Sequence, residues 1–251
     1  MFERRLLIEG LPDPAYTHRA RAVRDMRKSS VFKRGIFPDT QCYANDGRQN
    51  MIDRSRERED WWSKVEFADV IVFDLDGTLV DSDIANFLSY KAAAMHVLSH
   101  QVDGFNFNPG IRITRETLAR IIPWTCDEQL TRIVAQKECI YPQYLSRTIL
   151  NAQLVDIIER SKNKELILAT NSRRSRADML LHHHGHIDTF ARRVYRDSED
   201  PKDKYMRLMP GLLKEEKSIV VFENDESAIE SAIACGIGVD RIINVCGMGH
   251  E

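Results

Sequence analysis

Short apolar runs recur at wide intervals in the chain from residue 66 onward. Each run follows a charged or small residue and ends in polar groups, as in ADVIVFDLD (68–76), KELILATN (164–171) and KSIVVFEND (217–225). Continuous β-branched runs of this length are typical of strands buried on both faces of a parallel sheet. The segment DRIINV (240–245) predicts one more short strand.

Helical patterns separate the later strands. NAQLVDIIERSK (151–162) precedes the second run and RADMLLHHH (176–184) follows it. KYMRLMPGLLKEE (204–216) precedes the third run, and SAIESAIACG (227–236) follows it, with Gly236 as a C-cap. This alternation predicts an α/β fold, a doubly wound parallel sheet with right-handed crossovers.

Residues 77–163 connect the first two predicted strands, and this connection is longer than a single crossover helix requires. They contain three helical patterns, ANFLSYKAAAMHVLSHQ (85–101), TRETLARII (114–122) and CDEQLTRIVAQKECI (126–140). We therefore predict a small helical insertion at about 83–150, beside the sheet and after its first strand.

Residues 1–65 differ from the rest of the chain. They hold 14 Lys and Arg against 10 Asp and Glu, with several Pro and Gly residues and few apolar clusters. We interpret them as an arginine-rich N-terminal extension of a main domain at 66–251, anchored by Trp61 and Trp62. A binding arm for nucleic acid or for a protein assembly is the alternative.

Bulk composition narrows the class of protein. The chain is 43% hydrophobic, which is typical of a globular protein. Its net charge is −2, so the chain as a whole has no excess of positive charge that would attract nucleic acid or a membrane surface. The five cysteines form no C-x-x-C pair and are typical of reduced thiols. No apolar run approaches the roughly 18–20 residues that span a bilayer. We therefore expect a cytoplasmic protein without membrane contact.

The tip of the first predicted strand carries two carboxylates, Asp74 and Asp76. Neighbouring carboxylates repel, so keeping both ionised requires a cation, most simply Mg²⁺. Asp74 is suited to nucleophilic attack on phosphorus, and Asp76, one step further out, to acid catalysis on a leaving oxygen. Gly77 permits a sharp turn and Thr78 supplies a hydroxyl.

The whole set of motifs resembles the haloacid dehalogenase (HAD) superfamily. FDLDGTLVDS (73–82) is similar to the first motif of its phosphatase and phosphomutase members, and LATNS (168–172) to the second. The stretch ending in DPKDKY (200–205) resembles the approach to the family's lysine, and VVFENDESAI (220–229) its acidic fourth motif. The resemblance covers about 66–245 and implies a Rossmann-like core with a helical cap.

The resemblance also implies roles for individual residues. Asp74 would form an aspartyl-phosphate, Asp76 would protonate the leaving group and then activate water, and Thr170 would hold a phosphoryl oxygen. The charge-balancing lysine would be Lys202 or Lys204, and Lys202 is favoured because an acidic residue and then a helix follow it. The implied Mg²⁺ ligands lie in the first and fourth motifs: Asp74, Asp76, Glu223, Asn224 and Asp225.

These assignments predict a Mg²⁺-dependent phosphatase acting on a small phosphorylated metabolite or nucleotide. Thr78, Asn171 and Arg173 are the candidate substrate contacts, and at least one arginine of RRSR (173–176) is expected near the phosphate. A phosphatase for polynucleotide ends and a phosphomutase are alternatives. Asn224, where the family usually has a carboxylate, also leaves open a weak or inactive HAD-like subunit of a larger assembly.

Overall fold

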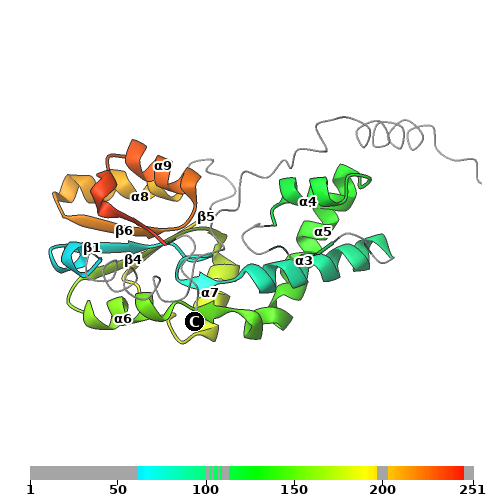
Figure 1. Ribbon diagram of the computed structural model, residues 1–251, viewed down its shortest axis with the longest axis horizontal. Coiled ribbons are helices and arrows are strands. Elements are labelled where there is room, and N and C mark those ends of the chain that lie inside the picture. The colour runs from blue at the N-terminus through cyan, green and yellow to red at the C-terminus, as the bar shows by residue number, and fades with distance from the viewer. Residues whose placement is uncertain are drawn as a thin grey trace, which may run out of the picture.

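A five-stranded parallel sheet forms the centre of the computed structural model, which describes residues 61–99, 102, 105, 106, 108, 113–196 and 203–245. The strand order is β5-β4-β1-β6-β7 (Figure 1). The strands are β1 (Val70–Phe73), β4 (Glu165–Arg173), β5 (Arg192–Arg196), β6 (Ile219–Glu223) and β7 (Ile242–Asn244). The order reverses at β1, so the predicted doubly wound sheet is confirmed.

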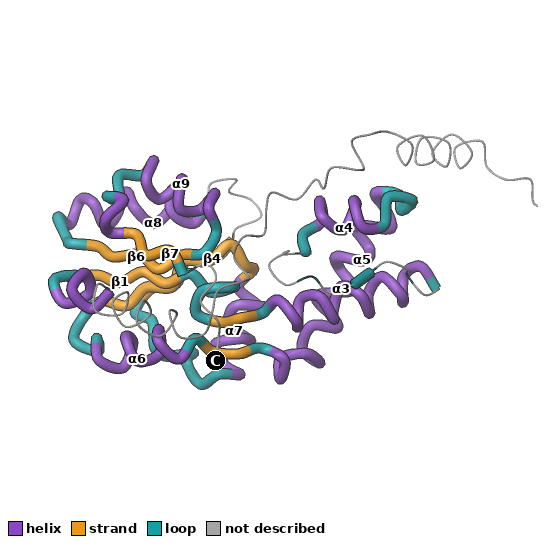
Figure 2. The backbone as a smooth tube through the Cα atoms, in the orientation of Figure 1, coloured by secondary structure: helices purple, strands orange, loops and turns teal. Residues whose placement is uncertain are grey.

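The strand β1 lies between β4 and β6 and is parallel to both (Figure 2). Its four residues are fully buried, and Ile71 pairs in register with Leu166 on one side and Val220 on the other. A central strand covered on both faces has no solvated side. This explains why VIVF reads as a continuous apolar run in the sequence.

Helices cover both faces of the sheet (Figure 1). The helices α6 (Ala152–Arg160) and α7 (Arg174–His183) pack on one face with a cluster that includes Phe73 and Phe222. The helices α8 (Lys204–Leu212) and α9 (Glu226–Ala234) cover the other face through Tyr205, Met209 and Ala232. These four helices match the predicted helical patterns, although α7 begins two residues earlier and α9 one residue earlier than predicted.

One strand of the sheet, β5, has no counterpart among the predicted strands. Its sequence is RRVYR, and its residues are half-buried or exposed at the sheet edge. An edge strand packs on one side only, so its sequence needs no long apolar run. The arginine-rich segment therefore reads as a polar connection.

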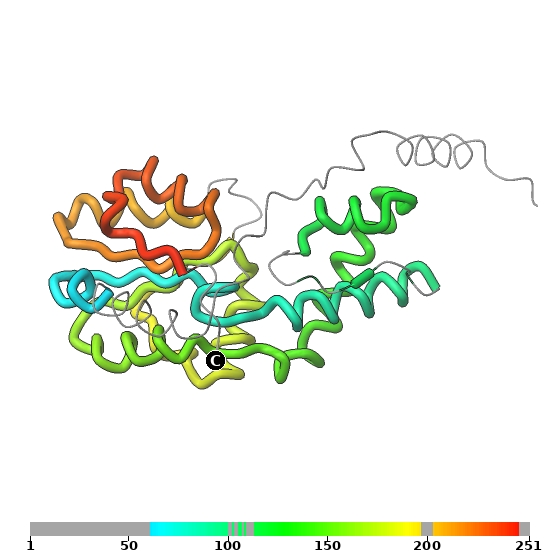
Figure 3. Tube along the Cα trace, in the orientation of Figure 1, coloured from blue at the N-terminus to red at the C-terminus, as the bar shows by residue number. Residues whose placement is uncertain are grey.

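A helical insertion leaves the sheet after β1 (Figure 3). Two short antiparallel strands, β2 (Val80–Asp81) and β3 (Ile149–Leu150), bring its two ends together. Between them lie α3 (Asp83–Leu98), α4 (Arg115–Ile121), α5 (Asp127–Ile140) and the 3-10 helix η2 (Tyr141–Arg147). The insertion has an apolar cluster of its own, which includes Phe87, Leu118 and Ile133.

The predicted anchor of the N-terminal extension is part of the main core. Residues 61–66 are helical, and Trp61 is buried with its ring edge-on to Phe222, with 5.4 Å between centroids. Trp62 is partly buried under the Arg160 guanidinium. The predicted boundary at residue 65 therefore falls inside a packed helical segment. Residues 1–60 of the predicted extension lie outside the described residues.

No helix in the described part of the chain is long and apolar enough to cross a membrane.

The ring of Phe73 joins the strand β1 to the helical layer beneath it. It is fully buried, stacks on Phe222 with 5.3 Å between ring centroids, and meets Phe190 edge-on. We predict that Phe73→Ala lowers the free energy of unfolding by about 3–5 kcal/mol in urea denaturation. The control Phe67→Ala, at a ring that is 73% exposed, changes it by about 0.5 kcal/mol or less. A loss below about 1 kcal/mol for Phe73→Ala would contradict this packing.

Candidate active site

The candidate site begins where β1 ends. Asp74 to Leu79 turn back on themselves, with the Gly77 amide donating to the Val80 carbonyl at 2.8 Å. Gly77 has a φ of +86°, and an added Cβ would lie 2.3 Å from the Asn224 side-chain nitrogen. Only glycine fits both constraints. The turn places the first motif directly against the end of β6.

Asp74, Lys204 and Glu223 form a buried ionic group at this sheet edge. The Lys204 ammonium lies 2.5 Å from Asp74 Oδ1 and 2.6 Å from Glu223 Oε2. Tyr205 donates its hydroxyl to Glu223 Oε2 at 2.7 Å. All four residues are at least 95% buried. Two carboxylates therefore share one ammonium away from water.

Burial and the neighbouring charges shift the pKa values of Asp74 and Lys204. Burial, reinforced by Glu223, raises the pKa of Asp74 to about 7, although Lys204 acts in the opposite direction. Burial disfavours the Lys204 ammonium, but Asp74 and Glu223 outweigh it and raise the pKa of that lysine. Lys204 therefore stays cationic, and Asp74 is the group that titrates near neutral pH.

Asp76 is held by a different set of donors. Its Oδ1 accepts hydrogen bonds from Ser82 Oγ at 2.7 Å and from Arg176 Nη2 at 2.6 Å. Ser172 Oγ donates to its Oδ2. The pKa of Arg176 is raised because Asp76 outweighs the effect of burial. Asp76 thus accepts hydrogen bonds from three separate parts of the chain, which fix its position.

The remaining predicted residues divide into buried and exposed groups. Thr170 is buried in the second half of β4, and its hydroxyl accepts from the Ser172 amide at 3.0 Å. Thr78 is buried and donates to Asn224 Oδ1 at 3.2 Å. Asn171 and Arg173 are exposed. The structure gives neither a contact with the carboxylates.

Lys204, not the favoured Lys202, is the lysine that the structure places against Asp74. Lys202 lies outside the described residues. Asp203, between them, caps α8 by accepting from the amides of Tyr205 and Met206. Lys204 is therefore the first helical residue and points into the core. The sequence showed both lysines but not where the helix begins.

Sequence reasoning also missed the partners of the predicted groups. Ser82, Ser172 and Tyr205 donate to the site carboxylates, and none was singled out. Arg176 was visible only as one member of RRSR. The phase of α7 decides between the arginines, because Arg174 pairs with Asp178 on the helix surface while Arg176 turns inward.

The motif pattern and this fold agree with known proteins. The family model of haloacid dehalogenase-like hydrolases matches residues 68–236. The chain belongs to this hydrolase family. The match confirms the predicted family and its Rossmann-like core, and with them the prediction of a HAD-type hydrolase.

Individual relatives of this hydrolase are distant. A phosphorylated carbohydrates phosphatase from Thermotoga maritima is 24% identical over 189 residues, covering 70% of this chain and 85% of that protein. The structure of CbbY from Rhodobacter sphaeroides in complex with phosphate aligns with a TM-score of 0.57 at 18% identity, over 73% of this chain and 89% of that one. A HAD hydrolase of family IA from Entamoeba histolytica aligns with a TM-score of 0.54 at 19% identity, over 72% and 85%. The solved structures support the fold alone.

The predicted metal ligands of the hydrolase differ in how many contacts their oxygens already make within the protein. Glu223 directs Oε2 to Lys204 and Tyr205, and its Oε1 accepts from the amides of Asn224 and Asp225. Asp225 caps α9 by accepting from the amides of Ser227 and Ala228. In the described part of the chain, no three His, Cys, Asp or Glu side chains gather as a metal-binding group.

The donors that remain still fit Mg²⁺. They are the Asp74 carboxylate, the main-chain carbonyl of Asp76 and the Asn224 amide oxygen, all of them the hard oxygen ligands that Mg²⁺ prefers. Burial, followed by the charge of Glu223, raises the pKa of Asp74, and a cation bound there would favour the anionic carboxylate. Only one of the three donors can carry a negative charge, so these residues would form a Mg²⁺ site of low charge.

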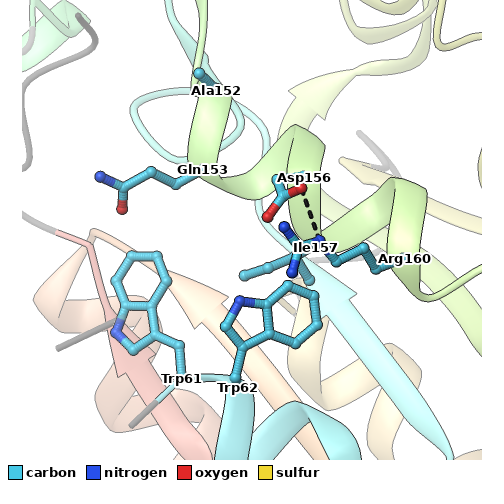
Figure 4. Close-up of a pocket in the computed structure, with 7 residues that line it drawn as sticks. All are labelled: Trp61, Trp62, Ala152, Gln153, Asp156, Ile157 and Arg160. Carbon is cyan, nitrogen blue, oxygen red and sulfur yellow. Dashed lines mark hydrogen bonds and ion pairs between the residues drawn. The ribbon is translucent and has the colours of Figure 1, made fainter. Parts of the chain in front are cut away.

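A separate pocket of about 310 Å³ lies between Trp61, Trp62 and α6 (Figure 4). Gln153, Asp156 and Arg160 line its other side, and Arg160 pairs with Asp156 at 2.9 Å. None of the predicted site residues lines this pocket, so it is not the reaction site.

The shifted ionisation of Asp74 gives a pH prediction. A nucleophilic carboxylate must be anionic, and the raised pKa keeps Asp74 protonated below about 7. At limiting Mg²⁺, kcat/KM of the hydrolase should therefore rise with pH through about 7, and saturating Mg²⁺ should move this rise to lower pH. The check is a pH–rate profile with two phosphate esters whose own second pKa values, near about 6, differ measurably. A rising limb that follows the ester's pKa would refute the assignment to Asp74.

Proposed function

We propose that this hydrolase is a phosphatase that cleaves a phosphate monoester of a small metabolite or nucleotide. The observation that carries the proposal is the buried Asp74 carboxylate beside the Lys204 ammonium at the tip of the central strand. A carboxylate held out of water next to a fixed cation is suited to attack an anionic phosphoryl group. The Thermotoga maritima relative, named as a phosphorylated carbohydrates phosphatase, supports the ester class.

The proposed reaction has two steps. An Asp74 oxygen attacks phosphorus, the bond from phosphorus to the ester oxygen breaks, and Asp76 transfers a proton to that oxygen. Water then attacks the phosphorus of the aspartyl-phosphate, Asp76 takes a proton from it, and the bond to Asp74 breaks. The products are an alcohol and inorganic phosphate, and the carboxylate of Asp74 is regenerated.

Lys204 and Thr170 serve the transferring group in this scheme. Lys204 keeps its positive charge between Asp74 and Glu223, so it balances the negative charge of the nucleophile and the phosphoryl oxygens. Thr170 lies in β4, two residues beyond Leu168, which is the partner of Phe73 in β1, and its hydroxyl is proposed to hold one phosphoryl oxygen. Thr78, Asn171 and Arg173 remain proposed substrate contacts.

The proposed cofactor is Mg²⁺. Asp74, the Asp76 carbonyl and Asn224 would hold it, with Asp225 as the alternative if the turn after β6 shifts. When bound, the ion neutralises charge on the phosphoryl oxygens during transfer. The neutral Asn224 predicts weaker binding than a carboxylate would give.

The helical insertion is proposed to act as a cap. The strands β2 and β3 join it to the sheet directly beyond the Asp74 turn, so its helices lie next to the site. A cap of this size would close over small substrates and exclude water. This favours a small molecule over a polynucleotide end.

A weak or inactive HAD-like subunit is the second candidate. The neutral Asn224 and the commitment of Glu223 to Lys204 reduce the charge available for a metal. Such a protein would retain the fold for its surfaces, with residues 1–65 as the proposed contact with nucleic acid or a protein assembly.

The test of the phosphatase proposal is turnover of a panel of phosphate esters with Mg²⁺ and with EDTA. We predict Mg²⁺-dependent phosphate release by the full chain and a loss of at least about 10³-fold in Asp74→Asn, because an amide forms no acyl-phosphate. Asp69→Asn is the matched control at the other end of β1, where the carboxylate accepts from Ser218. It should keep most of the activity.

Thermal unfolding checks that Asp74→Asn is folded. Residual activity above about a tenth of the wild type in folded Asp74→Asn would refute the nucleophile. An absence of turnover by the wild type with every ester at millimolar Mg²⁺ would favour the non-catalytic candidate.

A further inference from the structure

A buried lysine of the insertion, Lys137, has an incomplete set of partners. Its side chain, on α5, is 1% exposed. Among the described residues, the one carboxylate within ion-pair distance is Glu138, its neighbour in sequence, at 3.0 Å and itself 30% exposed. Burial, reinforced by the nearby Arg176, lowers the pKa of Lys137 to about 8. A buried ammonium with one half-exposed partner is a costly arrangement for the fold alone.

Aromatic rings surround this ammonium. Its Nζ lies 5.2 Å from the ring centroid of Tyr90 and 4.8 Å from that of Tyr141. Ring faces attract a cation but accept no strong hydrogen bond, so they stabilise the charge only in part. The position thus keeps a cation in place while leaving it able to donate to a ligand.

A second cation shares the Tyr141 ring. Arg176 Cζ lies 5.3 Å from the same centroid, and among the described residues its buried Nε has no hydrogen-bond partner. Two positive groups, one from the insertion and one from α7, therefore converge on one ring. Like charges in a buried region repel. Asp76 and Glu138 offset part of this repulsion, and an anionic group of a ligand beside both cations would offset more.

This pair of cations lies beside the reaction site. Arg176 Nη2 is 2.6 Å from Asp76 Oδ1, and Asp76 is two residues from the proposed nucleophile. A molecule whose ester phosphate reaches Asp74 would extend its remaining part toward Arg176 and Lys137. Lysine and arginine together bind phosphate or carboxylate groups.

We propose that Lys137 and Arg176 bind a second anionic group of the substrate. The preferred substrate is then a phosphate monoester that also carries a carboxylate or another phosphate, and Lys137 determines this preference. The inference rests on the proposed phosphatase function. Arg176 exchanges its contact with Asp76 for the ligand, which frees Asp76 to carry a proton.

Matched pairs of esters test the preference in the full chain. Fructose 1,6-bisphosphate against fructose 6-phosphate tests a second phosphate, and 3-phosphoglycerate against glycerol 3-phosphate tests a carboxylate. We expect kcat/KM to be at least about tenfold higher for the member that carries the additional anionic group, in at least one pair, as one charge-assisted hydrogen bond supplies. The pair that shows the preference identifies the group.

Substitution then assigns the preference to Lys137. Lys137→Met keeps the apolar stem and should lower the ratio of the two kcat/KM values about tenfold. Lys137→Arg should retain more of the ratio than Lys137→Met. Lys91→Met is the control within the insertion, where the lysine lies 5.8 Å from the centroid of the Phe87 ring, and should leave the ratio at its wild-type value.

Binding to Asp74→Asn, measured by calorimetry with the same four compounds, gives the preference without turnover. Equal affinities within both pairs, or an unchanged ratio in folded Lys137→Met, overturn the inference while leaving the phosphatase intact. If the wild type hydrolyses none of the esters and Asp74→Asn binds none of them, both proposals fail.

Discussion

The ionic contact between Asp74, Lys204 and Glu223 is the constraint that the rest of the site depends on. A buried charge is tolerated only when it is paired and hydrogen-bonded, and here one ammonium serves two carboxylates with Tyr205 completing the set. The three charged groups come from the ends of β1 and β6 and the start of α8. The sheet order, which places β6 beside β1, is what brings them together.

A second buried ion pair, between Asp76 and Arg176, lies next to the group of Asp74, Lys204 and Glu223. Asp76 is neutralised by Arg176 and hydrogen-bonded by Ser82 and Ser172, so the two aspartates of one motif have separate cationic partners. Separate partners place the two carboxylates in different electrostatic environments, and the proposed reaction gives each a different role. The insertion adds Lys137 to this side of the site. Charged side chains from the sheet, from α7 and from the insertion therefore lie near one another there.

The sequence predicts the strands that form continuous apolar runs and the polar site residues that follow those runs. The strands β1, β4 and β6 are covered on both faces, and their continuous apolar runs placed Asp74, Asp76 and Thr170 at one edge. The edge strand β5 escaped prediction because its half-buried RRVYR sequence needs no such run. Lys204 and Arg176 were among the candidates but could not be chosen from their basic neighbours. The choice depends on helix phase, which Asp203 sets for α8 and which the sequence pattern leaves undetermined.

Substitution of the two candidate lysines tests the central claim most directly. Lys204→Met removes the ammonium that two buried carboxylates share, so the free energy of unfolding at pH 8 should fall by about 3–5 kcal/mol, and less at pH 5 where a carboxylate is protonated. Lys202→Met is the comparison at the other candidate lysine and should change the free energy of unfolding much less than Lys204→Met does. The account is contradicted if Lys202→Met is the destabilising variant and Lys204→Met leaves the free energy of unfolding unchanged.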